Sequence, residues 1–305
     1  MPTFDTPEPI SVRIDLPGGE VRIIAGDRTD TVVEVWSGDD EEQVPIQVGY
    51  AGGTLVVKAA RPETSTLSSL SRHAGGTGAL VAAALRQSWS WSGLSGLFGD
   101  WDSTRVTIEL PSGSHVQGEA MAGEFHCAGR LGDCRLKTDY GDIRLDSAAT
   151  IRLSSDSGEI TVEPATGRAE ITAGSGDIRI NELDGTALIR NDDGEIYLGE
   201  VTGDLRLIGV NGDMHVHRTH GDVEAKTVHG SVRIGEIARG SVVLTSTTGD
   251  LEVGIRQGTA AWLDVSTANG SLVNSLAPHD GPEAFDESVE IRARSHDGDI
   301  VIRRA

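Results

Sequence analysis

The chain is poor in cysteine, in aromatic residues and in basic residues. It has 2 Cys among 305 residues, aromatic residues make up 4%, and 26 Lys and Arg stand against 47 Asp and Glu. The formal charge of −21 opposes binding to nucleic acid or to an anionic membrane surface, because both require cations at the interface. So few aromatic side chains also leave little material for stacking on bases or sugars. We therefore expect no nucleic-acid partner.

Long apolar runs and catalytic motifs are missing as well. No stretch reaches the length of a transmembrane helix, and Met1–Pro9 holds no apolar run, so we expect no secretory signal peptide and a cytoplasmic location. The chain has no nucleophile elbow, no phosphate loop and no His-Glu-x-x-His motif. Cys127 and Cys134 are expected to be free thiols in the core. These observations predict a protein that is not an enzyme and has no cofactor.

Glycine, in contrast, is abundant and periodic. From Gly158 to Gly230 a glycine returns every nine residues. A period this strict indicates one short structural unit that is stacked repeatedly. The unit is clearest in Gly176–Ile180, where glycine and an acidic residue precede an apolar, a polar and an apolar residue. This pattern predicts a turn followed by a strand with one buried face.

The full period is 18 residues, because units with Asp or Glu after Gly alternate with looser units such as Gly185-Thr186. Two strands per coil predict an all-β fold, a parallel β-solenoid with about 18 residues per coil and two sheets across a thin core; a three-faced β-helix is the alternative. The predicted inward pairs, two and four residues after Gly, are Ile178/Ile180, Ala187/Ile189, Ile196/Leu198, Leu205/Leu207 and Met214/Val216. A further apolar residue follows seven after Gly at Leu183, Val201, Val210 and Ile237.

The repeats do not occupy the whole chain. We predict a small N-terminal β cap in residues 1–61, the solenoid in 104–276 and closing strands in 277–305. Residues 62–103 read as a Ser-, Gly- and Trp-rich insertion with a short helix at Gly78–Arg86. The large apolar side chains that follow this helix are Trp89, Trp91, Leu94, Leu97, Phe98 and Trp101.

So much apolar surface in a Gly- and Ser-rich segment must be covered by something. It either folds back onto the solenoid or forms the contact with a partner or a second copy, since clustered aromatic residues mark interaction surfaces. Contact of residues 78–101 with a lipid interface is a third alternative. We take the six apolar residues as the candidate partner-binding site.

Several sequence features together resemble those of a known family. They are the opening Met1–Ile10, the turn at Asp27–Asp30, the Gly-Asp-Ile units and the closing Gly298–Arg304. With these features the chain resembles the bacterial β-strand-repeat family labelled "putative adhesin", a domain of unknown function. The resemblance implies a parallel β-repeat fold and no known catalytic residues.

The acidic residues after Gly, such as Asp177 and Asp213, would align along one edge of the stack. They either cap turns by accepting backbone N–H groups or bind Ca²⁺ as some nonapeptide repeats do. His215 and His217 are expected on the outer face of one strand, where they are either solvated or a metal-chelating pair, and we assign no metal site.

The sequence therefore predicts a non-enzymatic β-solenoid scaffold or binding protein that presents rigid faces to a protein or small-molecule partner. The alternative is a self-assembling structural protein, with possible homo-oligomers. A Ca-binding adhesin-like repeat protein is the lesser alternative.

Overall fold

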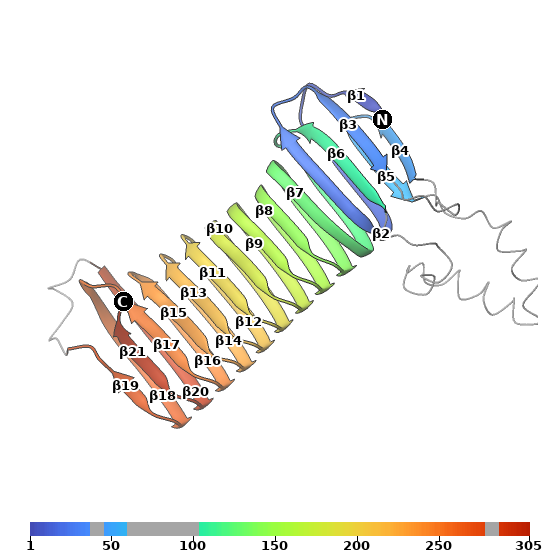
Figure 1. Ribbon diagram of the computed structural model, residues 1–305. Helices are drawn as coiled ribbons and strands as arrows, with labels where there is room; N and C mark the ends of the chain where they lie inside the picture. The colour runs from blue at the N-terminus through green and yellow to red at the C-terminus, as the bar shows by residue number, and fades with distance from the viewer. Residues whose placement is uncertain (37–45, 60–103, 278–286) are drawn as a thin grey trace, which may run out of the picture.

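The computed structural model describes residues 1–36, 46–59, 104–277 and 287–305, and the regular structure in these ranges consists of β-strands alone. The strands form an elongated stack with the N-terminal strands at one end and the C-terminal strands at the other (Figure 1). The prediction of an all-β repeat fold is confirmed. The helix predicted at Gly78–Arg86 lies outside the described residues.

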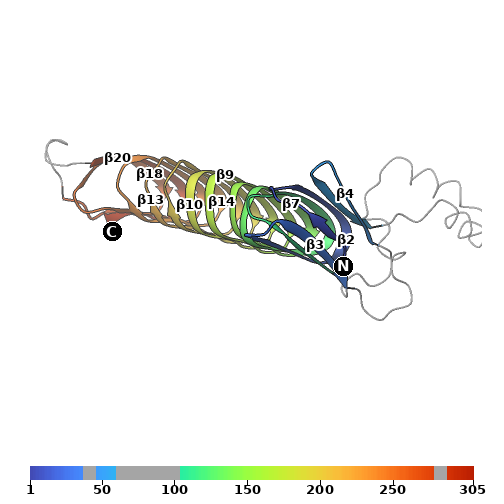
Figure 2. The same cartoon turned by 90° about the horizontal axis from the view of Figure 1, so that it is seen from above.

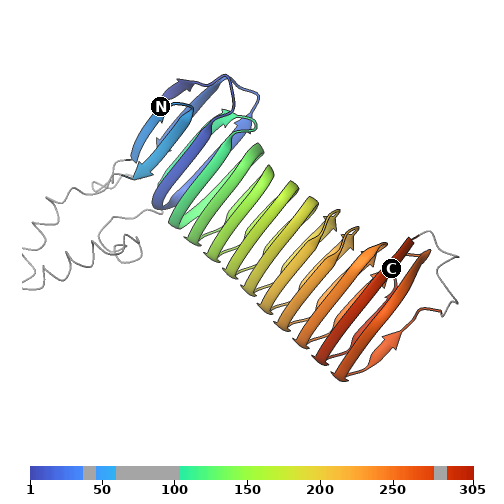
Figure 3. The same ribbon diagram turned by 180° about the vertical axis from the view of Figure 1, so that it is seen from behind.

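The middle of the stack is built from parallel coils. Its first part consists of long curved strands. Strand β7 (His115–Tyr140) runs through more than one coil, because its beginning pairs with β2 and its end with the next coil. The following coils are one strand each: β8 (Ile143–Ser157), β9 (Ile160–Ser175) and β10 (Ile178–Asp193). Later coils are divided into two shorter strands: β11 (Ile196–Val201), β12 (Leu205–Asn211), β13 (Met214–Thr219), β14 (Val223–His229), β15 (Val232–Ile237), β16 (Gly240–Thr248) and β17 (Leu251–Ile255). The same row of strands is seen from above and from behind (Figures 2 and 3).

Each coil contributes one segment to each of two sheets. Ile160, Ile178 and Ile196 pair in parallel on the sheet that contains β11, β13 and β15, which we name the A face. Ala169 and Ala187 pair on the opposite sheet, which contains β12, β14 and β16 and which we name the B face. The partners are 18 residues apart in these coils, whereas a register shift between Ala148 and Thr150 shortens the coil of β8.

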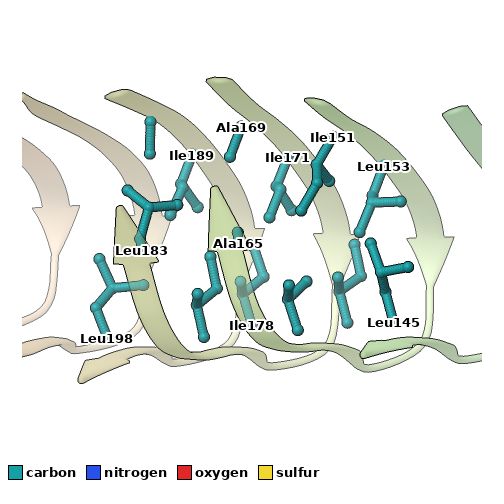
Figure 4. Close-up of a cluster of buried hydrophobic side chains, with 14 of the residues drawn as sticks. Leu145, Ile151, Leu153, Ala165, Ala169, Ile171, Ile178, Leu183, Ile189 and Leu198 are labelled. Atoms are coloured by element: carbon teal, nitrogen blue, oxygen red, sulfur yellow. The ribbon is translucent and has the colours of Figure 1, made fainter. Parts of the chain in front are cut away.

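The core is the thin layer between the two faces. Side chains from the A face, such as Ile178 and Leu198, point toward side chains from the B face, such as Ile171 and Ile189 (Figure 4). The predicted inward pairs are all buried, as are Leu183, Val201 and Ile237. Val210 is exposed, because β12 keeps its alternation after the buried Leu205, Leu207 and Gly209, and this places Val210 on the outward side. Cys127 and Cys134 are buried free thiols, as predicted.

Glycine is required along one edge, where the B face of one coil turns into the A face of the next. Gly176 has a φ of 122°, and a Cβ there would lie 2.3 Å from the carbonyl oxygen of Gly158 in the preceding coil. The same close approach recurs at Gly194 and Gly212. A side chain would collide with backbone at each of these positions, which explains the 18-residue glycine period of this edge.

Buried hydroxyl and amide groups line the inside of the same edge. The hydroxyl groups of Ser155, Ser246 and Ser295 donate to the carbonyl oxygens of Gly141, Gly230 and Gly249 at 3.0–3.2 Å. Thr138 and Asn191 make equivalent hydrogen bonds to the glycine of the preceding coil. These side chains satisfy carbonyl groups that the turn leaves without a ladder partner.

The N-terminal end is closed by antiparallel strands. Its strands are β1 (Thr3–Asp5), β2 (Ser11–Gly26), β3 (Asp30–Trp36), β4 (Ile46–Ala51), β5 (Thr54–Ala59) and β6 (Arg105–Pro111). Strand β2 pairs in parallel with β7 on one side and with β5 and β6 on the other. The reversed strands β4 and β3 then pair with β5 and β6, and β1 pairs with β3. Antiparallel strands end the parallel repeat and protect it from continued strand addition.

The C-terminal end is interleaved in a similar way but lacks reversed strands in its described part. Its strands are β18 (Thr259–Asn269), β19 (Leu272–Asn274), β20 (Glu287–Asp297) and β21 (Ile300–Arg304). The last coil in the sequence, β20 and β21, pairs with β16 and β17 on one side and with β18 and β19 on the other. The chain therefore returns to insert its C-terminal coil inside the stack, and β18 and β19 form the outermost coil (Figure 1).

Candidate functional site

The partner-binding residues predicted from the sequence lie outside the described part of the chain. They are Trp89, Trp91, Leu94, Leu97, Phe98 and Trp101. The structure therefore leaves this site a prediction. The features that can be judged are the two edges and the two outer faces of the stack.

The acidic edge is used to connect coils. Asp142, Asp177 and Asp213 each accept, through Oδ1, the backbone N–H group of a residue in the following coil, at 2.7–3.0 Å. Asp250 and Asp299 repeat this arrangement at the C-terminal end. The capping interpretation of these carboxylates is confirmed. Each cap joins an ionised acceptor to a backbone donor, which is a stronger hydrogen bond than a neutral one.

The same carboxylates are not arranged as a metal site. In residues 1–36, 46–59, 104–277 and 287–305, no three His, Cys, Asp or Glu side chains converge as metal ligands. In each of these caps the Oδ1 atom already accepts a backbone N–H group of the following coil. Calcium binding stays a prediction that the structure gives no geometry for.

A column of stacked side chains runs along the outside of the A face. Arg179 contacts the ring of Tyr197 at 5.4 Å, and His215 stacks on the other side of Tyr197 at 5.1 Å with an angle of 10° between the rings. Arg179 also forms ion pairs with Glu159 and Asp177. This column satisfies its own charges, so it offers little to a ligand. His215 acts here as a stacking partner in the column.

A groove crosses the B face near the N-terminal end of the stack, over β2, β7, β8 and β9. It encloses about 490 Å³, and its charged side chains are Arg13, Arg135, Arg152, Arg168, Asp133 and Glu170. These residues project outward because they alternate with the buried Val12, Cys134 and Ile151 in the pleat. Parallel pairing places Arg135 beside Arg152 on the adjacent coil. Cations from four coils are therefore collected on one surface of an acidic protein.

The arginines of this groove differ in their partners. Arg152 donates to Glu170 from Nε at 3.1 Å and from Nη2 at 2.9 Å. Arg13, Arg135 and Arg168 are exposed, and among the residues that the structure places, none supplies a carboxylate within 4.0 Å of them. These three guanidinium groups therefore have no carboxylate partner among the described residues.

Sequence reasoning missed this groove. The outward residues considered from the sequence, His215 and His217, lie on the A face. The cationic column becomes visible only when the 17- and 18-residue pairings bring Arg135, Arg152 and Glu170 into line. The available signal was the excess of arginine over lysine at outward positions of residues 130–170, which contain Arg130, Arg135, Arg144, Arg152, Arg168 and a single lysine.

Further along the B face the charge changes sign. A second hollow, of about 520 Å³, has Asp204, Asp222 and Glu224 in its lining together with Arg168 and Arg206. Asp204 and Asp222 cap backbone N–H groups of the next coil, as the acids of the other edge do. Acidic residues therefore outnumber basic residues in this hollow, in contrast to the groove over β2, β7, β8 and β9.

The outermost C-terminal coil exposes apolar side chains. Trp262 is 78% exposed and Leu272 is 50% exposed, while Leu263 and Val265 are only partly buried against the core. Residues 257–277 contain one charged residue, Asp264, in a chain that is 24% charged. Within the described residues, β18 pairs only with β20, and β19 only with β21. This end presents two unpaired strand edges and little charge.

The stacked parallel coils, the apolar core and the glycine edges define a β-solenoid repeat protein, in which the outer faces are the surfaces left to bind. The chain belongs to the Toastrack DUF4097 family, whose model matches residues 10–303. No relative of the chain was found among curated proteins. The described residues contain no helix of the length and apolarity that crossing a membrane needs.

Two crystal structures are similar to the chain at 11% sequence identity. One is a "putative adhesin" from Bacteroides fragilis NCTC 9343, which covers 100% of this chain and 95% of its own length with a TM-score of 0.34. The other is a "putative cell adhesion protein" from Clostridium sporogenes ATCC 15579, with coverages of 100% and 98% and a TM-score of 0.18.

Proposed function

We propose that the chain is a non-enzymatic scaffold that presents the faces of a rigid β-solenoid, with coils of about 18 residues and two strands each, to a protein partner. The observation that carries this proposal is that the inward, edge and outward residues of each coil have different roles. Inward residues form an apolar layer, edge residues join coils, and only the outward columns vary in chemistry from coil to coil. A partner is therefore recognised by outward side chains on a preformed surface.

Site-specific photo-crosslinking in the source cell tests this function. A photoreactive residue is placed on the B face at Gln117, on the A face at Thr161, or on the predicted segment at Trp91. We expect one partner to be crosslinked reproducibly from one of these surfaces, and we expect this crosslink to be lost when the charges around that surface are removed. Equal, background-level joining from all three positions would contradict a binding function. A deletion of residues 64–100 tests separately whether the Trp-rich segment makes the contact.

The proposal includes a cytoplasmic location, which is supported by the two buried cysteines that remain free thiols. Cell fractionation with an antibody to the full chain tests it. Recovery of the chain outside the cell or bound to the envelope would contradict this part of the proposal and would leave the binding function standing.

Self-association is the second candidate function, and the exposed C-terminal coil favours it. Strand β18 has an unpaired edge in one sheet of the stack and β19 has one in the other, and both edges carry backbone donors and acceptors. A second copy of the chain presents the same two edges, the same distance apart. In a protein of charge −21, copies repel one another least where charge is scarcest, and residues 257–277 hold only Asp264. Among the described residues of the other end, the reversed strands β3 and β4 cover the parallel edges of β6 and β5.

Light scattering on single variants tests self-association. Leu272→Asp adds a charge to the exposed coil, and Val210→Asp adds the same charge at an exposed apolar position on the side of the stack. We expect the wild type and Val210→Asp to form dimers and Leu272→Asp to be monomeric. A wild-type monomer at high protein concentration would exclude this candidate.

A further inference from the structure

The cationic groove on the B face has a local charge opposite to that of the whole molecule. Arg13, Arg135, Arg152 and Arg168 line it against Asp133 and Glu170, in a chain whose formal charge is −21. Cations concentrated in one place on an acidic surface create a local potential that attracts an anion of limited size. The groove is therefore distinguished from the rest of the outer surface by charge as well as by shape.

One ion pair inside the groove shows that a carboxylate fits its arginines. Arg152 holds the carboxylate of Glu170 with two N–H groups, at 3.1 and 2.9 Å. Two-point contact of this kind matches the planar guanidinium to a carboxylate. Arg13, Arg135 and Arg168 have the same chemistry and no carboxylate of the described chain beside them.

The spacing of these arginines fixes the form of the ligand. Arg13 and Arg168 belong to coils that are four steps apart, since Arg13 pairs with Gln117, Gly132 bonds to Ser114, and the coils of Arg152 and Arg168 follow. Arg168 lies beside Thr150, and Glu170 takes the place next to Arg152 on that coil. At about 4.8 Å per coil the distance along the stack from Arg13 to the coil of Arg168 is about 19 Å, which is the length of about six residues of extended polypeptide. Beyond Arg168 the second hollow holds Asp204, Asp222 and Glu224 against Arg206, which is already paired with Glu224, so this stretch attracts an acidic ligand less than the groove does.

The residues that line the groove also favour an acidic peptide over a nucleic acid as its ligand. They include no Trp, Tyr or Phe on which a base would stack. A longer polyanion would also run over the second hollow, where Asp204, Asp222 and Glu224 outnumber the arginines and would repel it. Carboxylates on a short extended chain meet neither obstacle.

Building on the proposed scaffold function, we propose that this groove binds an extended acidic segment of a partner protein, about six residues long, through Arg13, Arg135 and Arg168. Acidic side chains of the segment pair with the three arginines, which lie two coils, or about 9.6 Å, apart along the stack. The contacts are exposed charge pairs, so binding weakens as salt is added.

Fluorescence anisotropy with a labelled octaglutamate peptide and the full-length protein at low salt tests the proposal. The groove variant is Arg13→Gln/Arg135→Gln/Arg168→Gln. The matched control is Arg22→Gln/Arg144→Gln/Arg233→Gln, which removes the same charge from the A face, where each arginine has a carboxylate partner. We expect the groove variant to weaken binding by at least about tenfold and the control by less than about threefold.

Four results would overturn the proposal: no wild-type binding, equal loss in both variants, equal binding of an octaglutamine peptide, or tighter competition by a single-stranded DNA of the same charge. Circular dichroism of each variant shows that it is folded. If peptide binding fails while photo-crosslinking still joins a partner from another face, the groove assignment fails and the scaffold function stands. If the peptide binds but no partner is crosslinked in cells, the groove assignment stands and the scaffold function fails.

Discussion

The carboxylate of Asp213 accepts the backbone N–H group of Ser231, 18 residues later, at 2.7 Å. Replacement of Asp213 by Ala removes this acceptor and leaves the N–H group at the turn without its partner. We expect the free energy of unfolding to fall by about 1–2 kcal/mol. Urea denaturation measures it. Asp192→Ala is the control, because Asp192 is an exposed residue and its replacement removes the same charge; equal loss in both variants would mean that charge alone, and not the cap, matters.

Glycine at position 176 is required by both its backbone and its surroundings. Gly176→Ala forces a side chain into a φ of 122° and places its Cβ 2.3 Å from the carbonyl oxygen of Gly158. We expect a loss of at least about 2–3 kcal/mol in unfolding free energy, or failure to fold. Gly49→Ala, whose Cβ meets no atom within 4 Å, should change stability by no more than about 1 kcal/mol. A tolerated Gly176→Ala variant would show that neighbouring coils are less closely spaced than the structure has them.

Glu252 ties the C-terminal coil to the stack and makes stability depend on pH. Burial raises the pKa of Glu252, but hydrogen bonds from Arg303 at 2.7 Å and Arg233 at 2.6 Å outweigh it and hold the pKa below its ordinary value of 4.5. The folded state therefore keeps Glu252 ionised to lower pH than the unfolded chain does. The stability that ionised Glu252 contributes is complete above the pKa that this residue has in the unfolded chain. It is lost as pH falls through the lower pKa of the folded state.

The test is urea denaturation of the wild type and of Glu252→Gln between about pH 6 and pH 3. We expect the wild type to be more stable near neutral pH and the difference to shrink as pH falls. Glu182→Gln, at an exposed position, is the control and should give a constant small difference. A Glu252→Gln difference that stays constant or grows in acid would contradict the assignment.

Cys127 reports on the opening of the stack. The hydrogen bond to Cys134 and burial together raise the pKa of the Cys127 thiol well above its ordinary value of 9.0. Because the thiolate is the reactive form, we expect Cys127 to resist alkylation in the native protein at pH 8. Cys134 should resist it because it is buried, and both should react in denaturant. Mass spectrometry after timed alkylation measures this. Rapid native labelling of either cysteine would show that this part of the core is open.

The regular part of the fold could be predicted from the sequence because its determinants are local. Ile178 and Ile180 follow Gly176 in a fixed pattern, and each step of that pattern has a separate physical reason in the structure. The capping role of Asp177 follows in the same way from its place beside the turn.

The order of coils in space could not be predicted, because a repeat pattern identifies strands without identifying their neighbours. Ile291 pairs with Val242 on one side and with Leu263 on the other, so the last coil lies inside the stack. The cationic groove depends on the same information, since Arg13 and Arg135 come to lie two coils apart on one face only through long-range pairing. The hydroxyl groups of Ser155 and Ser246 were a readable signal, because each stands three residues before an edge glycine.

The central claim is that the stack is a preformed rigid scaffold, and native-state hydrogen exchange of the full-length protein tests it most directly. The account predicts slow exchange of the amide groups from β8 to β17, at a rate set by global unfolding and the same with and without the octaglutamate peptide outside the groove. Fast exchange through these coils in the free protein, or protection that spreads along the whole stack only when the peptide binds, would contradict it.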